Sequence, residues 1–186
     1  LPLLEPSFGG GRFLLSAVDR LIASWRHHGG SDGRELINAI RAVELDSQTY
    51  ATFHEVLRDH LLSHEIADDV AEELVDAWLL HEDFLLADFD FEFAFVIGNP
   101  PYVRQELIPD ELLTLYRSKY QTMVGRADLY IAFMERSLDL LSDGGKLSFI
   151  CADAWVKNDY GRGIRSKIAE SFNLAYYVDM YGLDAF

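Results

Sequence analysis

Asn99, Pro100, Pro101 and Tyr102 form a short motif directly after the apolar run 93–98. The Asn99 side-chain oxygen and the Pro100 carbonyl are hydrogen-bond acceptors, and the two prolines fix the backbone that aims them. Two acceptors can hold the hydrogens of an exocyclic amino group and make its nitrogen nucleophilic, while the Tyr102 ring offers a flat face to a planar substrate. The motif therefore indicates methyl transfer to an amino nitrogen. A proline turn that closes a strand is the alternative explanation.

A second motif, the glycine-rich turn at residues 5–13, lies between the expected first strand and first helix. Its glycines let the backbone approach a ligand closely, and the start of the helix offers unpaired N–H groups. Nucleotide-type ligands bind at this position, outside the carboxyl end of a parallel strand. The turn lacks the Lys-Ser/Thr ending of a phosphate-binding loop, which disfavours ATP or GTP hydrolysis.

Two acidic segments follow the glycine-rich turn along the chain. Glu44, Leu45 and Asp46 end the expected second strand, where a carboxylate can accept hydrogen bonds from both hydroxyls of a ribose. Asp46 is also expected to cap the following helix. Asp83 and Phe84 follow a further apolar stretch and can offer a carboxylate to an adenine amino group and a ring to its face. For Asp83 the alternative is a solvated loop carboxylate.

Strand-like and helix-like segments alternate along the chain, the pattern of a parallel α/β sheet. The strand segments are apolar throughout, as strands buried on both faces should be. The expected strands are 3–5, 37–44, 93–98, 146–152 and 174–180, with a weaker one before Asp83. The expected helices are 11–27, 47–60, 65–80, 109–120, 128–141 and 159–171.

The composition fits one domain without a membrane span. The chain has 186 residues, of which 49% are hydrophobic, enough for one full core. No apolar run approaches the ~20 residues of a transmembrane helix. The single cysteine, Cys151, lies in an expected buried strand, and the six histidines show no metal-binding spacing. We therefore expect an intracellular protein without disulfides, metal or membrane contact.

The charge is unusual for a nucleic-acid enzyme. The formal net charge is −15, whereas contacts to phosphates need lysine and arginine. Much of the excess acid falls between residues 55 and 92, and Arg104, Arg117, Lys119 and Arg126 make the region after Tyr102 locally basic. The composition predicts that this chain alone holds DNA weakly.

Taken in order, the motifs resemble those of the S-adenosylmethionine-dependent adenine-N6 DNA methyltransferases of the fused restriction–modification kind. The turn at 5–13 resembles their first motif, although Phe8 stands where a small residue or Cys is common. The resemblance implies that S-adenosylmethionine is bound by Glu5, Pro6, Gly9, Gly11, Glu44, Leu45, Asp83, Phe84, Asn99 and Phe133. It implies catalysis by Asn99, Pro100, Pro101 and Tyr102, with Tyr102 and Phe186 holding a flipped base.

The same resemblance implies a Rossmann-like class I methyltransferase fold of the α/β class, with a mostly parallel sheet flanked by helices and truncated at both ends. Residues 1–186 are then a catalytic-domain fragment with a cofactor half at about 1–90 and a catalytic half at about 91–186. An acidic helical insertion is expected at about 55–80. A target-recognition domain, absent here, would supply most contacts with DNA. We expect a cytoplasmic bacterial or archaeal protein whose fragment alone is inactive.

The implied reaction is direct methyl transfer to an adenine flipped out of the duplex, which needs no metal or covalent nucleophile. Cytosine-C5 methylation is disfavoured because it needs a reactive thiolate and Cys151 lies in a buried setting. Three alternatives stay open: a glutamine-N5 protein methyltransferase, an RNA amino-methyltransferase, and a binding module without turnover. Cytosine-N4 and adenine-N6 are not separated by these residues.

Overall fold

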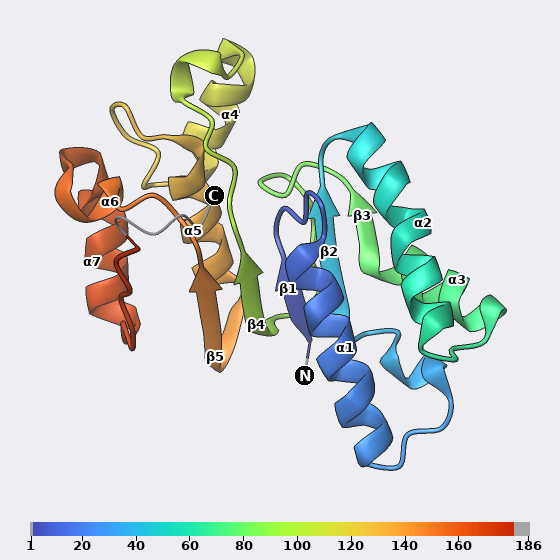
Figure 1. Ribbon diagram of the computed structural model, residues 1–186. Coiled ribbons are helices and arrows are strands. Elements are labelled where there is room, and N and C mark those ends of the chain that lie inside the picture. Colours follow the sequence, from blue (N-terminus) through green and yellow to red (C-terminus); the bar gives the residue numbers. More distant parts are fainter. Residues whose placement is uncertain (1, 181–186) are drawn as a thin grey trace.

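A five-stranded parallel sheet forms the centre of the protein. The computed structural model describes residues 2–180. The strands are β1 (Leu3–Glu5), β2 (Ile40–Glu44), β3 (Leu79–His81), β4 (Phe93–Gly98) and β5 (Leu141–Phe149). They lie in the order β3-β2-β1-β4-β5, and every neighbouring pair runs parallel (Figure 1). The parallel α/β sheet expected from the alternating segments is confirmed.

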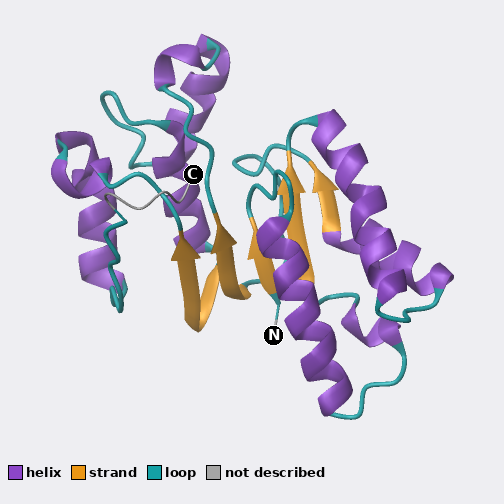
Figure 2. Ribbon diagram, in the orientation of Figure 1, coloured by secondary structure: helices purple, strands orange, loops and turns teal. Residues whose placement is uncertain are grey.

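Helices connect the strands and cover both faces of the sheet (Figure 2). The α-helices are α1 (Arg12–His27), α2 (Ser47–Ser63), α3 (Asp68–Trp78), α4 (Asp110–Lys119), α5 (Leu129–Asp139), α6 (Ala154–Lys157) and α7 (Arg162–Ser171). Three short 3-10 turns are η1 (Gly33–Leu36), η2 (Gln105–Leu107) and η3 (Asp159–Gly161). No helix within residues 2–180 is long and apolar enough to cross a membrane.

Two hydrophobic clusters lie on opposite faces of the sheet because successive strand residues point to opposite sides. In β2, Ile40 and Ala42 join the cluster formed with α1, α2 and α3, whereas Val43 joins the cluster formed with α4, α5 and α7. The α1 stripe at Leu14 and Val18 is fully buried, as the helical repeat requires.

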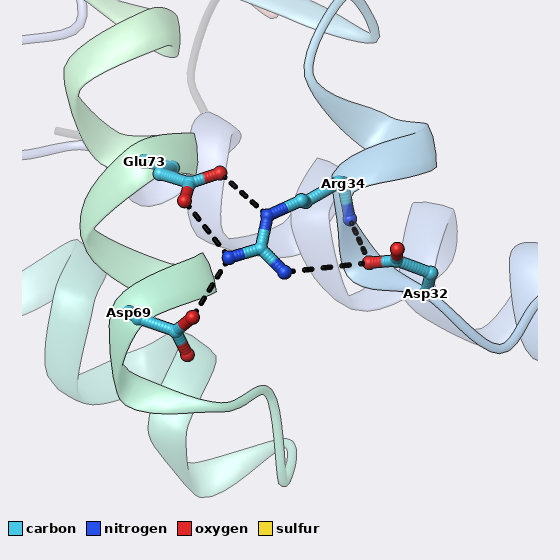
Figure 3. A network of polar contacts seen from close by, with 4 residues as sticks. All are labelled: Asp32, Arg34, Asp69 and Glu73. Carbon is cyan, nitrogen blue, oxygen red and sulfur yellow. Dashed lines mark hydrogen bonds and ion pairs between the residues drawn. The ribbon is translucent and has the colours of Figure 1, made fainter.

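The Arg34 side chain ties the turn before β2 to α3 (Figure 3). Its guanidinium donates to both carboxylate oxygens of Glu73, at 2.8 Å each, and to Asp69 at 2.7 Å. Its backbone N–H donates to Asp32, 3.0 Å away. A planar guanidinium suits such paired contacts, so the cluster fixes where η1 lies against α3.

β1 and β4 are neighbours in the sheet, although β2 and β3 lie between them in the sequence. The strand order therefore reverses between β1 and β4. Connections from these two strands leave in opposite directions, and this leaves a crevice at their carboxyl ends. Ligands of open parallel α/β sheets bind in such crevices. The fold therefore places its candidate site at the ends of β1 and β4.

One expected strand is wrong. Residues 174–180 form no strand, and Leu174, Tyr176 and Val178 are more than half exposed. The apolar composition suggested a strand, but the segment pairs with no strand in the described part of the chain. The sheet still has five strands, because β3 forms where the weaker strand before Asp83 was expected.

Several boundaries also differ from expectation. The helix expected at 65–80 is the shorter helix α3, which begins at Asp68. It ends at Trp78 because Leu79 pairs with Ala42 of β2. β2 begins at Ile40 rather than at residue 37, after the η1 turn. β5 starts at Leu141 and ends at Phe149, so Cys151 lies just beyond the strand rather than within it. The short helix α6 was not expected.

Candidate active site

The carboxyl edge of the sheet gathers the motifs singled out in the sequence. Glu5 ends β1, Glu44 ends β2, Asp83 follows β3 by two residues, and Asn99 follows β4 directly. Parallel pairing brings these strand ends to one edge. The Ser7 hydroxyl in the glycine-rich turn donates to the Asn99 backbone oxygen at 3.3 Å. The expected cofactor loop and the expected catalytic loop are therefore in direct contact.

Glu5 is the unusual titratable group of this edge. It is 1% exposed, and its Oε2 atom has no hydrogen-bond partner within residues 2–180. Burial raises the pKa of Glu5 from 4.5 to about 8. An unpaired buried carboxyl group is costly, and such groups cluster at binding sites. Glu5 is thus the carboxyl group of this edge whose surroundings are most typical of a binding site.

The glycine-rich turn leaves open space at two of its glycines. A Cβ at Gly9 or Gly10 would meet no atom within 4 Å. The Gly9 N–H donates to Oε2 of Glu44 at 3.0 Å, which holds the turn against the end of β2. Phe8, at a position where a small residue was expected, is 4% exposed and packs on Phe53 with ring centroids 4.9 Å apart. Phe8 therefore fixes the turn to the hydrophobic core, while Gly9 and Gly10 keep open space beside them.

Gly11 is the glycine that this turn cannot replace. Its φ is +67°, and an added Cβ would lie 1.8 Å from the Phe53 ring. Phe53 is buried and cannot swing aside, so we expect Gly11→Ala to lower the free energy of unfolding by about 1–3 kcal/mol from backbone strain alone, with overpacking added. Urea unfolding measures the effect. Gly10→Ala is the matched control, and an equal loss in both variants would contradict this role.

Glu44, the last residue of β2, accepts hydrogen bonds from the backbone of two neighbouring loops. The two carboxylate oxygens of Glu44 accept from the backbone N–H groups of Gly9 and Asp46, at 3.0 and 2.9 Å. Each oxygen keeps a second lone pair for a ligand hydroxyl. Leu45 is 64% exposed beside it. Asp46 caps α2 by accepting from Thr49, which confirms its expected structural role.

Asp83 is held rather than solvated. Its carboxylate accepts from the Leu85 N–H at 2.9 Å and from the Tyr116 hydroxyl at 2.5 Å. Phe84 is 2% exposed and packs against Phe133, with ring centroids 5.0 Å apart. Both rings, which the resemblance placed against the cofactor adenine, lie in the core here, so their contact with a ligand stays a prediction.

Asn99 and Tyr102 form one polar unit. The Tyr102 hydroxyl lies 2.8 Å from Oδ1 of Asn99 and 3.2 Å from the Ile150 carbonyl. This contact fixes the Asn99 amide and leaves its oxygen a second lone pair. Pro100 is buried, whereas the Tyr102 ring is 54% exposed. The acceptor is therefore immobilised while the ring beside it stays accessible.

Phe186 and Cys151 are two further residues for which the sequence predicts a role or its absence. Phe186, expected to hold the base with Tyr102, lies outside the described residues. Cys151 is half-buried with a free thiol, and burial raises its pKa. A raised thiol pKa disfavours the thiolate, in keeping with the prediction that Cys151 is no nucleophile.

Sequence reasoning missed two side chains that support the site. Tyr116 holds Asp83, and the Arg136 guanidinium donates to the backbone oxygens of Leu85 and Ala87. Arg136 also lies over the Phe84 ring, 5.2 Å from its centroid. No local spacing reveals these contacts, because α4 and α5 reach the loop only through the tertiary fold.

An open cavity of about 650 Å³ lies between the loop before α5 and the residues of η3 and α7. Its lining residues are Val124, Gly125, Arg126, Asp159, Tyr160, Arg162, Gly163 and Ser166. A chain of aromatic side chains links it to the motif: the Tyr160 and Tyr130 hydroxyls are 3.3 Å apart, and the Tyr130 and Tyr102 ring centroids 6.3 Å apart. The cavity and the Asn99 motif are therefore connected through the buried Tyr130 side chain.

Sheet order and site position together define a class I methyltransferase fold. A solved structure described as a class I S-adenosylmethionine-dependent methyltransferase, from Listeria monocytogenes, superposes with a TM-score of 0.59 at 19% identity, over 91% of this chain and 44% of that one. The chain belongs to the Eco57I restriction-modification methylase family, whose model matches residues 26–186. The restriction–modification resemblance of the motifs is confirmed.

Two relatives align with nearly the whole chain. The type II methyltransferase M.PaeR7I of Pseudomonas aeruginosa is 52% identical over 99% of this chain, and M.XhoI of Xanthomonas vasicola is 46% identical over the same share. The alignments cover 32% and 34% of these relatives. The chain thus spans about a third of the length of the curated relatives it matches.

Proposed function

We propose that the protein containing this chain transfers the methyl group of S-adenosylmethionine to the N6 amino nitrogen of adenine in DNA, as part of a restriction–modification system. One observation carries the proposal: the Asn99 acceptor is immobilised by Tyr102 and lies in contact with the glycine-rich turn at the strand-order reversal. Family membership and the type II methyltransferase relatives support the reaction class. The choice of adenine N6 rests on the resemblance of the ordered motifs to the adenine-N6 enzymes, because Asn99 and its neighbours alone do not separate adenine N6 from cytosine N4.

The residues of the turn fit this cofactor. S-adenosylmethionine carries an ammonium and a sulfonium charge, and Glu5 offers an unpaired buried carboxyl oxygen at the start of the turn, in which Gly9 and Gly10 leave open space. Glu44 presents free lone pairs where ribose hydroxyls would bind. The cofactor, when bound, supplies an activated methyl group.

The protein's own part in the reaction is binding and alignment. The Asn99 side-chain oxygen and the Pro100 carbonyl accept the two hydrogens of the target amino group, which localises the nitrogen lone pair for attack. Tyr102 stacks on the flipped base, since a base within the duplex cannot be reached. The Ser7 hydroxyl of the cofactor turn donates a hydrogen bond to the Asn99 backbone oxygen. This contact fixes the cofactor turn relative to the Asn99 motif, so the methyl donor and the target base are held next to each other. Such proximity lowers the activation barrier of methyl transfer.

The accessible charge near Tyr102 suits a DNA strand. Arg104, Arg117, Lys119 and Arg126 are all exposed, and the cavity is lined by Arg126 and by Arg162, which is paired with Asp159. Phosphates bind such arginines in a salt-dependent way. With a net charge of −15 on the chain, this basic region is the part of the surface on which we place the DNA.

Two Tyr102 variants separate stacking from hydrogen bonding. We expect Tyr102→Phe to lose only the hydroxyl contacts to Asn99 and the Ile150 carbonyl, worth about 1 kcal/mol or under tenfold in kcat/KM. Tyr102→Ala also loses the stacking face, worth about 1–3 kcal/mol per base, so its loss should be larger by a further factor of about 5 to 160. Steady-state kinetics on DNA with the full-length protein measures both, and equal losses would contradict a stacking role.

The acceptor class is tested with labelled cofactor. The full-length protein is incubated with methyl-labelled S-adenosylmethionine and, in separate reactions, unmethylated plasmid DNA, RNA or a protein extract. The proposal expects label in DNA only. Label in protein would favour the glutamine-N5 alternative, and label in RNA the RNA amino-methyltransferase; either result, without labelled DNA, overturns the proposal.

A further inference from the structure

Outside the catalytic edge, two histidines and one aspartate converge between α1 and α2. His60 and His64 are four residues apart at the end of α2, and Asp19 lies in the middle of α1. Asp19 Oδ1 is 2.7 Å from Nε2 of His60 and 2.7 Å from Nε2 of His64. The sequence showed no metal spacing to us, yet residues four apart on a helix share one face.

We propose that Asp19, His60 and His64 form a binding site for a divalent transition metal, Zn²⁺ in the first instance, which links α1 to α2. The three ligand atoms all lie within 4.8 Å of one another. Two imidazoles and a carboxylate are a ligand set that zinc uses, with bonds of about 2.0–2.2 Å and a free position for water.

The distances allow a tetrahedral centre with little movement. Ligand atoms of such a centre stand about 3.3 Å apart, so Asp19 needs to withdraw by about 0.6 Å from each nitrogen. Its side chain is 50% exposed and free to do so, whereas the His60 and His64 side chains are 24% and 28% exposed. The two rings pack in a T-shaped arrangement, with centroids 4.9 Å apart. The histidines are thus set in place and the carboxylate is adjustable.

Neighbouring contacts favour the same assignment. The Arg26 guanidinium bonds the His64 backbone carbonyl and fixes the end of α2. A second group of such residues, His54, Glu72 and Asp76, is weaker, because Glu72 is already paired with Arg58 at 3.1 Å.

The site has a structural consequence. α1 begins directly after the glycine-rich turn, and α2 begins directly after Glu44, Leu45 and Asp46. A metal joining the two helices therefore braces the elements that carry both cofactor loops, without touching the Asn99 motif. The inference does not rest on the proposed function.

Zinc titration calorimetry on the EDTA-treated full-length protein tests the site. We expect one zinc to bind and Asp19→Asn to weaken it tenfold or more, with the same loss in His64→Gln. His27→Ala, which removes an exposed histidine at the end of α1, should leave zinc binding unchanged. Equal zinc affinity in wild type and Asp19→Asn, no binding in wild type, or a loss confined to His54→Ala would overturn the assignment.

Thermal unfolding supplies a second readout that separates metal loss from damage to the fold. Zinc should raise the unfolding midpoint of the wild type and leave that of Asp19→Asn unchanged, because only a species that binds the native state stabilises it. In EDTA the two midpoints should lie close together. A zinc-induced rise of the same size in the variant would contradict the site.

Discussion

Asn99→Ala is expected to lower methyl transfer by about 100-fold or more while cofactor affinity stays near that of the wild type. The variant removes one of two preorganised acceptors for the amino hydrogens, and removal of one such group typically costs about 10²–10³ in kcat. The backbone oxygen that Ser7 binds is retained. Single-turnover transfer to DNA and equilibrium cofactor binding, both with the full-length protein, measure the two effects.

Asn38→Ala is the matched control for this variant. Asn38 is exposed and precedes β2, at the opposite edge of the sheet from Asn99. It should turn over like the wild type. Near-normal turnover of Asn99→Ala would refute the assigned role, and a parallel loss of cofactor affinity would mean that Asn99 acts mainly as a cofactor ligand.

Cofactor binding is expected to release about one proton near pH 6.5. Burial raises the pKa of Glu5 to about 8, so the free protein holds this carboxyl protonated. A cationic ligand favours the ionised form and lowers the pKa again. The affinity should therefore rise with pH between about 6 and 7.5, by up to about tenfold per unit. Calorimetry in buffers of different ionisation enthalpy counts the released protons.

Glu5→Gln should bind the cofactor more weakly and without proton release, whereas Glu170→Gln, at an exposed position on α7, should behave as the wild type. Proton release that persists in Glu5→Gln would assign the effect to another group.

The contribution of Glu5 to the stability of the cofactor-free protein falls as the pH rises, whereas the cofactor affinity increases. Without cofactor, unfolding lets Glu5 ionise, so its raised pKa favours the folded state fully below pH 4.5 and this advantage is lost as the pH rises to about 8. Urea unfolding of the wild type and Glu5→Gln between these pH values measures the difference. A wild-type midpoint that follows the variant across the whole range would contradict a buried, protonated Glu5.

Much of the fold and of the site could be predicted from the sequence because both depend on local patterns. Fully apolar strand segments indicate a parallel sheet, and the motifs that follow them must then share its carboxyl edge, as Glu5, Glu44 and Asn99 do. The Asp46 cap is readable from a polar residue ahead of a helix. Element order and motif order were sufficient for these features.

The features that could not be predicted depend on contacts between distant segments. Gly11 is constrained by Phe53, and Asp83 is held by Tyr116 from another helix. The spacing of His60 and His64 is visible in the sequence, but Asp19 joins them only when α1 packs beside α2. Residues 174–180 are a prediction that failed: their apolar composition indicated a strand, and the described part of the chain forms none there.

Nucleoside analysis of DNA methylated by the full-length protein tests the central claim most directly. After transfer of labelled methyl from S-adenosylmethionine to unmethylated plasmid, the DNA is digested to nucleosides and the label is assigned by chromatography. The account predicts label in N6-methyladenine, with none formed by Asn99→Ala. Label in N4-methylcytosine or C5-methylcytosine would contradict it.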